Sequence, residues 1–304
     1  MEPPSPAVLA NETPARPRYL TLQCALDAGA DNDTPLLHFH DASAPEPDRR
    51  ASLKQLREGA HRYARALLAQ GVVRGDRVLL LLKTGETFVQ ALLGCMLAGA
   101  IPVPLPSTFT FGSKRAQLDA LSPIAASAEA AALITTPQLR DVLPEASIFA
   151  AQLRRVLTPL DLDGQGPGPR FLPSSSADQP AFIQYTSGTT GRPKGAVISQ
   201  RALMSNAAAI AGALDLGPGT VGVSWLPLFH DMGLVGVLLT ALAHPYPLHL
   251  MPPESFLFRP RRWLELMARC GATLTAAPNF AYELCVTRAA RVAPLPDRSA
   301  HHRR

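Results

Sequence analysis

Short apolar runs that alternate with amphipathic segments are the feature that most limits how this chain can fold. Residues 77–82 carry a continuous apolar run, which is typical of a strand buried on both faces. Ahead of it, apolar side chains at helical spacing predict a helix over residues 53–70. Further along we predict helices over 86–98 and 113–128, and strands over 100–105 and 131–135. This alternation favours an α/β fold with a mostly parallel sheet.

The same alternation resumes after a stretch dominated by Gly, Pro and Ser at residues 163–180. We predict strands over 181–185, 196–199, 221–225, 248–251 and 272–276, and helices over 200–214, 233–243, 261–269 and from 279. The domain organisation that follows is a loose N-terminus (1–18), a first α/β subdomain (19–162), a linker (163–180), a second α/β subdomain (181–288) and a basic irregular tail (289–304).

Composition excludes several classes of protein. Hydrophobic residues make up 47% of the 304 residues, which is enough for a sizeable core. The four cysteines include no C-x-x-C pair, so a disulfide scaffold or a thiolate zinc site is not expected. Of the net charge of +5, five arginines and one aspartate in the last 17 residues supply +4, which gives little support to a nucleic-acid groove.

No export or membrane signal is expected either. The N-terminus lacks a basic start followed by an apolar run, and the longest uncharged apolar run, residues 91–106, is interrupted by prolines. The sequence therefore predicts a cytoplasmic protein with reduced thiols and no membrane span.

The stretch that carries the most chemistry is residues 185–195, with the sequence YTSGTTGRPKG. Its glycines permit tight turns and close approach of backbone N–H groups to a ligand. Four hydroxyl side chains stand among those glycines, and one lysine adds a mobile positive charge. Such a loop after a buried strand is suited to holding a polyphosphate. The residues in question are Thr186, Ser187, Gly188, Thr189, Thr190, Gly191 and Lys194.

The loop differs from a Walker A motif in two respects. No Ser or Thr follows Lys194, and Gly195 leads into a predicted strand and not into a helix. The alternative to a phosphate site is a flexible surface loop rich in small polar residues.

This stretch resembles the phosphate-binding signature of the adenylate-forming superfamily, the acyl-activating, AMP-binding enzymes. Three further stretches, residues 224–234, 256–264 and 277–285, resemble fatty acyl-AMP ligases, and the resemblance runs from about Tyr19 to Arg288. It implies activation of a long-chain fatty acid by ATP and Mg²⁺ to an acyl adenylate and pyrophosphate. The acyl group would then pass to an acyl carrier protein or a carrier domain of a polyketide or peptide synthase.

The resemblance also assigns roles to individual residues. Lys194 and His230 would be catalytic, the residues of the loop would bind the β- and γ-phosphates, and Thr189 would contact the metal ion. The acyl substrate would be bound or flanked by Trp225, His230, Met232, Gly233, Leu234 and Asn279. For His230 the alternative is a hydrogen-bonded core residue, and for the apolar residues it is ordinary packing. Asp231 is expected to shape the turn.

Two further groups have weaker claims to function. His38 and His40 would share one strand face, but two histidines without a third ligand predict a structural or surface role. Arg259, Arg261 and Arg262 could meet an acidic carrier protein, although a solvated helix start is the simpler interpretation.

The family architecture is longer than this chain, so we expect an N-terminal part that lacks the small C-terminal domain and is inactive alone. Two alternatives remain open: part of a long-chain acyl-CoA ligase, or a non-catalytic truncated remnant.

Overall fold

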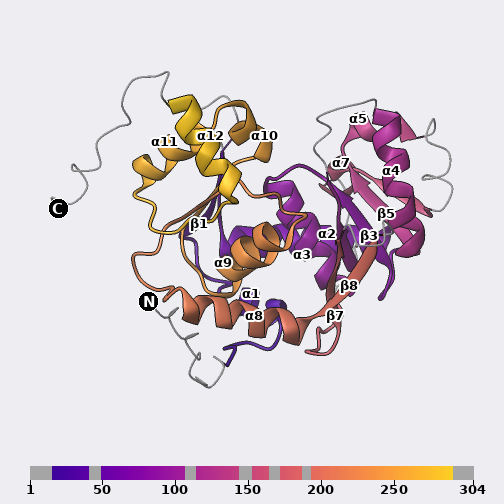
Figure 1. The fold of residues 1–304 in the computed structure, drawn as a ribbon. Coiled ribbons are helices and arrows are strands. Elements are labelled where there is room, and N and C mark those ends of the chain that lie inside the picture. Colours follow the sequence, from indigo (N-terminus) through magenta and orange to yellow (C-terminus); the bar gives the residue numbers. More distant parts are fainter. Residues whose placement is uncertain are drawn as a thin grey trace, which may run out of the picture.

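The strands of the computed structural model form three sheets within the residues that the structure describes, which are 16–40, 49–106, 114–143, 153–163, 172–186 and 193–289. Most neighbouring strands run parallel, as the alternation of strands and helices predicts. Figure 1 shows the largest parallel sheet on one side of the molecule, and helices α10, α11 and α12 on the other.

The first sheet is entirely parallel and confirms the strands predicted around 77–82, 100–105 and 131–135. Its order is β4 (Ile101–Pro104), β3 (Arg77–Leu81), β5 (Ala130–Thr135) and β6 (Arg155–Leu157). All six residues of β5 are buried, which explains why its sequence is apolar without alternation.

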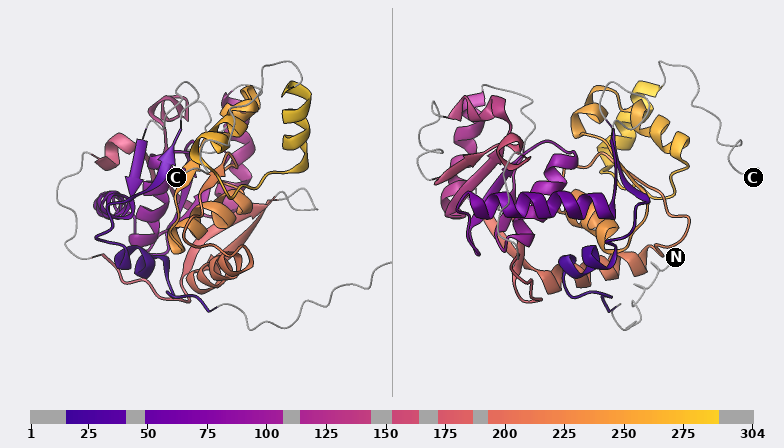
Figure 2. Two further views of the ribbon diagram at one scale, coloured as in Figure 1. Left: turned by 90° about the vertical axis from the view of Figure 1, so that its left-hand side faces the viewer. Right: turned by 180° about the vertical axis from the view of Figure 1, so that it is seen from behind.

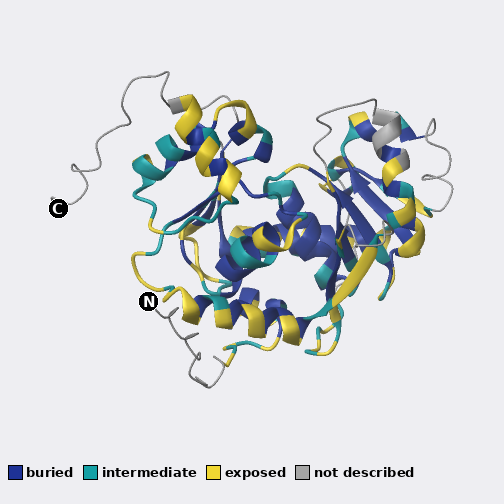
Figure 3. Ribbon diagram, in the orientation of Figure 1, coloured by how far each residue is buried: buried dark blue, intermediate teal, exposed yellow. Residues whose placement is uncertain are grey.

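Two long helices lie between the sheets. Their sequences account for where the first of them starts and for the burial of the second. Helix α2 (Leu53–Ala69) starts at a capping box, in which Ser52 accepts from the Gln55 N–H and the Gln55 side chain accepts from the Ser52 N–H. Helix α3 (Glu86–Leu97) is buried along most of its length. Figure 3 shows these helices as the buried centre of the molecule.

The second sheet joins strands from distant parts of the sequence. Its order is β2 (Arg49–Ser52), β1 (Pro35–Phe39), β10 (Leu248–Leu250) and β9 (Gly222–Ser224), with only the β1–β2 pair antiparallel. Residues 163–180 therefore mark a change in composition along the chain. They do not divide this sheet from the rest, because β1 and β2 come before them in the sequence and β9 and β10 come after them.

The third sheet is a hairpin of β7 (Pro180–Thr186) and β8 (Lys194–Ser199), which pair antiparallel. Strand β7 lies against β4 of the first sheet. Helix α8 (Gln200–Ala213) follows directly and is capped by the Ser199 hydroxyl, which accepts from the Ala202 N–H at 3.1 Å. In both views of Figure 2 the hairpin runs into α8 at the lower edge of the molecule.

The last third of the described chain departs from expectation in two places. The predicted helix over 233–243 is a π-helix, η2 (Met232–Leu239), continued by helix α9 (Thr240–Ala243). The predicted strand over 272–276 is wrong, because only the isolated bridge between Leu274 and Gly222 is formed there. The N–H groups of Thr273 and Leu274 both donate to the Val221 carbonyl, so no regular ladder can extend along the segment.

The remaining helices cover the sheets or close the chain. They are α1 (Leu22–Ala28), α4 (Lys114–Ser127), α5 (Pro137–Arg140), α7 (Pro159–Asp163), α10 (Pro253–Phe258), α11 (Arg261–Cys270) and α12 (Asn279–Ala289). None of the helices in the described ranges has the length and apolarity that a membrane crossing needs. Most of the predicted loose N-terminus, residues 1–15, and most of the basic tail, residues 290–304, lie outside the described residues.

Candidate active site

The two ends of the predicted phosphate-binding loop are held opposite each other by the β7–β8 ladder. Thr186 ends β7, Lys194 begins β8, and the two residues are direct partners in the register. This strand–loop–strand arrangement agrees with the distinction from a Walker A loop. Residues 187–192 lie outside the described residues, and with them the candidates Ser187, Gly188, Thr189, Thr190 and Gly191.

Lys194 is exposed, and no hydrogen bond or ion pair of its side chain occurs within the described part of the chain. Thr186 is exposed at the same end of the hairpin. An exposed ammonium group and an exposed hydroxyl group on paired residues fit the chemistry of a phosphate ligand, because both can donate to its oxygens.

Gly195 allows an aromatic ring to lie across the hairpin. It pairs with Tyr185, and a Cβ atom at Gly195 would lie 2.9 Å from the Tyr185 ring. The Tyr185 hydroxyl hydrogen-bonds to Ser127 at 3.0 Å, which ties the hairpin to the end of α4. The last glycine of the motif therefore holds the base of the loop in place through packing.

A second segment, residues 226–231, follows β9 and contacts the hairpin through a hydrogen bond. The Gln184 side chain of β7 donates from Nε2 to the Phe229 carbonyl. The His230 N–H donates to the Pro227 carbonyl at 3.2 Å, which closes a turn. His230 itself is exposed, with its ring beside that of Phe229 at a centroid distance of 4.8 Å. A buried core position, the alternative considered for His230, is therefore excluded.

The start of the π-helix is shaped by Asp231 and Gly233. The Asp231 carboxylate accepts from the Met232 N–H at 2.7 Å, in agreement with its expected role in the turn. At Gly233 a Cβ atom would lie 2.3 Å from the Pro227 carbonyl oxygen. Only glycine permits this approach, so Gly233 positions the His230 segment and does not itself offer a side chain to a substrate.

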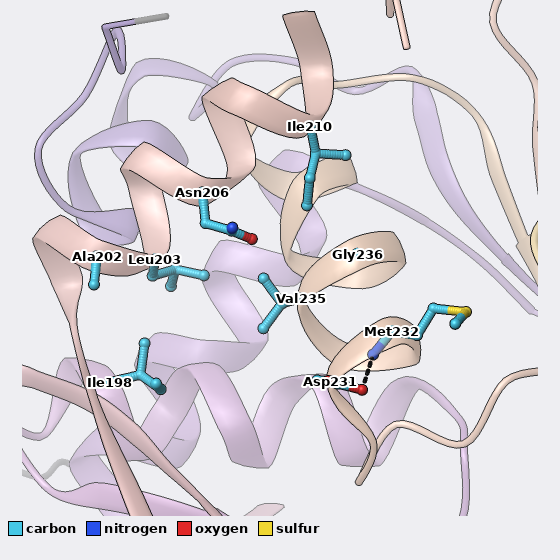
Figure 4. A pocket seen from close by; sticks show the side chains of 9 residues that line it. All are labelled: Ile198, Ala202, Leu203, Asn206, Ile210, Asp231, Met232, Val235 and Gly236. Atoms are coloured by element: carbon cyan, nitrogen blue, oxygen red, sulfur yellow. Dashed lines mark hydrogen bonds between the residues drawn. The ribbon is translucent and has the colours of Figure 1, made fainter. Parts of the chain in front are cut away.

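A groove of about 490 Å³ opens between α8 and the π-helix, next to Asp231. In Figure 4 side chains from both helices point into it. Apolar groups dominate the lining, which consists of Ile198, Ala202, Leu203, Asn206, Ile210, Asp231, Met232, Val235 and Gly236. Its apolar lining is suited to burying an apolar group.

Met232 is the predicted acyl-binding residue that lines this groove. Trp225 is instead 4% exposed and stacks face to face on Phe256, with ring centroids 3.9 Å apart. Leu234 is completely buried in the core. Asn279 is exposed at the first turn of α12 and does not line the groove. Sequence reasoning missed the α8 side of the groove, because its residues follow an ordinary helical apolar pattern.

The two predicted histidines join a third that the sequence did not single out. The ring of His38 stacks on that of His249 from β10 at 4.3 Å, and His40 Nε2 lies 2.9 Å from His249 Nδ1. Burial, reinforced by the neighbouring histidines and arginines, lowers the pKa of His249 to about 3. No group of side chains able to hold a metal ion is found in the described ranges.

The predicted arginine group is partly engaged within the chain. Arg259 and Arg261 each form an ion pair with Glu265, at 3.3 and 2.9 Å. The Arg259 side chain is 62% exposed, as a solvated helix start predicts, whereas that of Arg261 is 17% exposed and therefore largely buried.

Comparison with known proteins extends these findings. A putative acyl-CoA synthetase of Caulobacter vibrioides is 35% identical over 272 residues, which are 89% of this chain and 46% of the relative. The medium-chain-fatty-acid–[acyl-carrier-protein] ligase JamA of Moorena producens is 34% identical over 246 residues, covering 78% of this chain and 40% of the relative. The chain thus spans less than half the length of these relatives.

A solved structure from a study of fatty acyl-adenylate ligases of E. coli and L. pneumophila matches with a TM-score of 0.83. The identity is 33%, over 89% of this chain and 48% of that chain. The family model of the AMP-binding enzymes matches residues 27–302, which include the hairpin, the His230 segment and both helices of the groove. With a motif, a fold and a family model that agree over nearly its whole length, this chain belongs to the AMP-binding enzyme family.

Proposed function

We propose that the chain carries the phosphate-binding and acyl-binding parts of a ligase that activates a long-chain fatty acid with ATP. The single observation that carries the proposal is the position of the apolar groove. It opens beside Asp231, next to the exposed His230, and the His230 segment is hydrogen-bonded to the strand that leads into the phosphate loop. We therefore propose that the groove, the His230 segment and the base of the phosphate loop together receive the alkyl chain, the carboxylate and the polyphosphate.

The reaction needs positioning and charge neutralisation more than it needs acid–base chemistry. A carboxylate oxygen attacks the α-phosphorus of ATP, and the bond to the bridging oxygen of pyrophosphate breaks, giving acyl-AMP and pyrophosphate. Both reactants are anions, so cationic and N–H groups must offset their repulsion. We assign this role to Lys194, to Thr186 and to the loop residues 187–191, with His230 orienting the carboxylate.

Mg²⁺ would supply further neutralisation of the phosphate oxygens when bound. Thr189 is the residue that we propose to contact it. The hydroxyl of Thr186 and the ammonium group of Lys194 fit the remaining phosphate oxygens, since both are exposed at the base of the loop.

The groove would hold the acyl chain by apolar burial. Each buried methylene contributes roughly 0.8 kcal/mol, so about five methylenes on the walls formed by Val235, Met232 and Ile210 would add roughly 4 kcal/mol. This energy favours fatty acids over short carboxylic acids such as acetate.

For the second step we propose transfer to the phosphopantetheine thiol of an acyl carrier protein. The support is the likeness to a ligase named for that acceptor, JamA. Coenzyme A is the alternative acceptor, because the Caulobacter relative is named a putative acyl-CoA synthetase. Incubating the acyl adenylate with either thiol and identifying the thioester by mass spectrometry separates the two.

A second candidate is binding of ATP and acyl chains without turnover. Lys194 and His230 are both exposed, and adenylate chemistry benefits from a site that excludes water. We therefore propose that these 304 residues bind the substrates but release no pyrophosphate on their own.

Isotope exchange between pyrophosphate and ATP, measured with and without palmitate, tests both candidates. If the proposed activity is correct, a longer relative should show pyrophosphate exchange that depends on palmitate. Replacing its lysine equivalent to Lys194 should lower the exchange rate at least tenfold. Exchange by the purified chain itself would reject the binding-only candidate. A relative that shows no exchange with any fatty acid would contradict the activity.

A further inference from the structure

Gln184 occupies an unusual position for a polar side chain. It lies in β7, two residues before Thr186, and is only 8% exposed. Phe182, two residues earlier in β7, and Leu228, next to its hydrogen-bond partner Phe229 in the sequence, are both buried in the main core. A Leu or Met side chain would suit such surroundings, so an amide at this position needs a specific reason.

The hydrogen bond of this amide supplies that reason. Gln184 Nε2 donates to the carbonyl oxygen of Phe229, the residue that immediately precedes His230. A carbonyl oxygen can only accept, so the orientation of the amide is fixed by its partner. The bond links residues 45 positions apart in sequence.

The other half of the amide is left without a partner. Gln184 Oε1 is buried and has no hydrogen-bond donor among the described residues. Burying an unsatisfied carbonyl oxygen destabilises a fold. Among the described residues, the interaction that the amide makes is the bond to Phe229, so its contribution there is to hold the Phe229 backbone.

We propose that Gln184 is a positioning residue that fixes the His230 segment relative to the end of β7, where the phosphate loop begins. The inference rests on the proposed function, because it concerns the alignment of the carboxylate and phosphate subsites. Without the bond, residues 226–231 would still be tethered by β9 and the π-helix, but the His230 backbone would no longer be anchored to the hairpin.

Gln184→Met tests the proposal at similar volume, since it removes the amide donor without adding a charge or another hydrogen-bond donor. Gln179→Glu is the matched control, because the Gln179 oxygen accepts from the Ser176 N–H at 2.9 Å and a carboxylate preserves that role. If Gln184→Met does not fold, Gln184→Leu also removes the donor without adding charge.

Hydrogen exchange of the purified chain, followed by mass spectrometry, gives a readout independent of activity. We expect peptides covering residues 226–234 to exchange at least tenfold faster in the Gln184 variant, with β3 peptides and the Gln179 control unchanged. Equal exchange rates in a folded Gln184 variant would overturn the proposal.

Binding titrations with palmitate and with ATP separate positioning from general damage. We expect at least tenfold weaker palmitate binding and ATP binding within twofold, because the β7–β8 ladder is intact. Palmitate binding unchanged despite faster exchange would also overturn the role. An unaltered chain that binds neither ligand would count against the proposed function, and the exchange experiment would still decide whether Gln184 holds the segment.

Discussion

At two positions near the candidate site glycine is required because a Cβ atom would clash with neighbouring atoms, and not because the backbone needs a conformation that only glycine adopts. A Cβ atom at Gly195 would lie 2.9 Å from both the Tyr185 ring and the Ile183 side chain, and one at Gly233 would lie 2.3 Å from a backbone oxygen. Side chains can move aside more easily than backbone, so the two positions should differ in how strongly they resist substitution.

Gly195→Ala should lower the free energy of unfolding by about 1–3 kcal/mol, because the Tyr185 ring must move off β8. Urea unfolding followed by circular dichroism measures the change. Gly217→Ala is the control, since a Cβ atom there meets nothing within 4 Å. Equal stability of the two variants would contradict this account of the hairpin.

Gly233→Ala should be more damaging, by roughly 3 kcal/mol or more, because its obstacle is the Pro227 carbonyl oxygen. Gly236→Ala lies in the same π-helix, where the nearest atom is Met232 Cγ at 3.9 Å, and should be close to neutral. The melting temperatures of the two variants provide the comparison. A Gly233 variant as stable as the Gly236 variant would show that the turn is free to move.

At the scale of elements, the groove between α8 and the π-helix should select acyl chains by their length. Val235→Trp would fill space between the helices and should weaken palmitate binding at least tenfold, while octanoate binding changes less. Leu214→Trp, at the exposed end of α8 and outside the lining, is the control. Displacement of a fluorescent fatty acid measures both affinities, and a parallel loss for both chain lengths would argue against the groove.

The stacked histidines between β1 and β10 should make this pairing sensitive to acid. Burial lowers the pKa of His249 to about 3, with further lowering from the positive groups His38, His40, Arg50 and Arg269. The unfolded chain, with a histidine pKa near 6.5, therefore binds more protons than the folded chain between these two values. Stability should be constant above pH 7 and fall below pH 6.5 by up to about 1.4 kcal/mol per pH unit for this residue.

Urea midpoints at pH 7.5 and pH 5 test this dependence, and His249→Gln should reduce the difference between them. If the variant loses as much stability on acidification as the unaltered chain, the histidine cluster does not cause the acid sensitivity.

The elements differ in how far the sequence determines them. Helix α2 and strands β3 and β5 were predictable, because strong apolar periodicity and complete burial leave a clear pattern. The π-helix was not, since an apolar segment such as 232–239 shows the same composition whether its turns are α or π. The predicted strand over 272–276 failed because a strand depends on a partner as much as on its own residues.

The same limit applies to the candidate site. The residues of the phosphate loop stay a prediction, because residues 187–192 lie outside the described part of the chain; the sequence indicates them because glycine, hydroxyl and lysine residues at this spacing are unusual for packing. His249 and the α8 wall of the groove could not be predicted, because their roles depend on which distant segments meet. Gln184 did leave a signal, a single amide within an apolar strand.

For the whole molecule, the sheet that joins β1 to β10 predicts one cooperative unit. Residues 19–162 expressed alone would lose the partner of β1 and expose the apolar face of the sheet, so we expect no stable fold. In the full chain, unfolding followed by fluorescence of Trp225 and Trp263 should coincide with unfolding followed by circular dichroism. Two separated transitions would instead support independent subdomains on either side of residues 163–180.

The direct pairing of Thr186 with Lys194 has a practical meaning for engineering. Because the ladder fixes where the loop leaves and where it returns, a changed loop length would be absorbed between those two residues and would not shift the register of β8. We therefore expect that residues 187–193 can be replaced by a segment of another length while the pairing of Thr186 with Lys194 is kept.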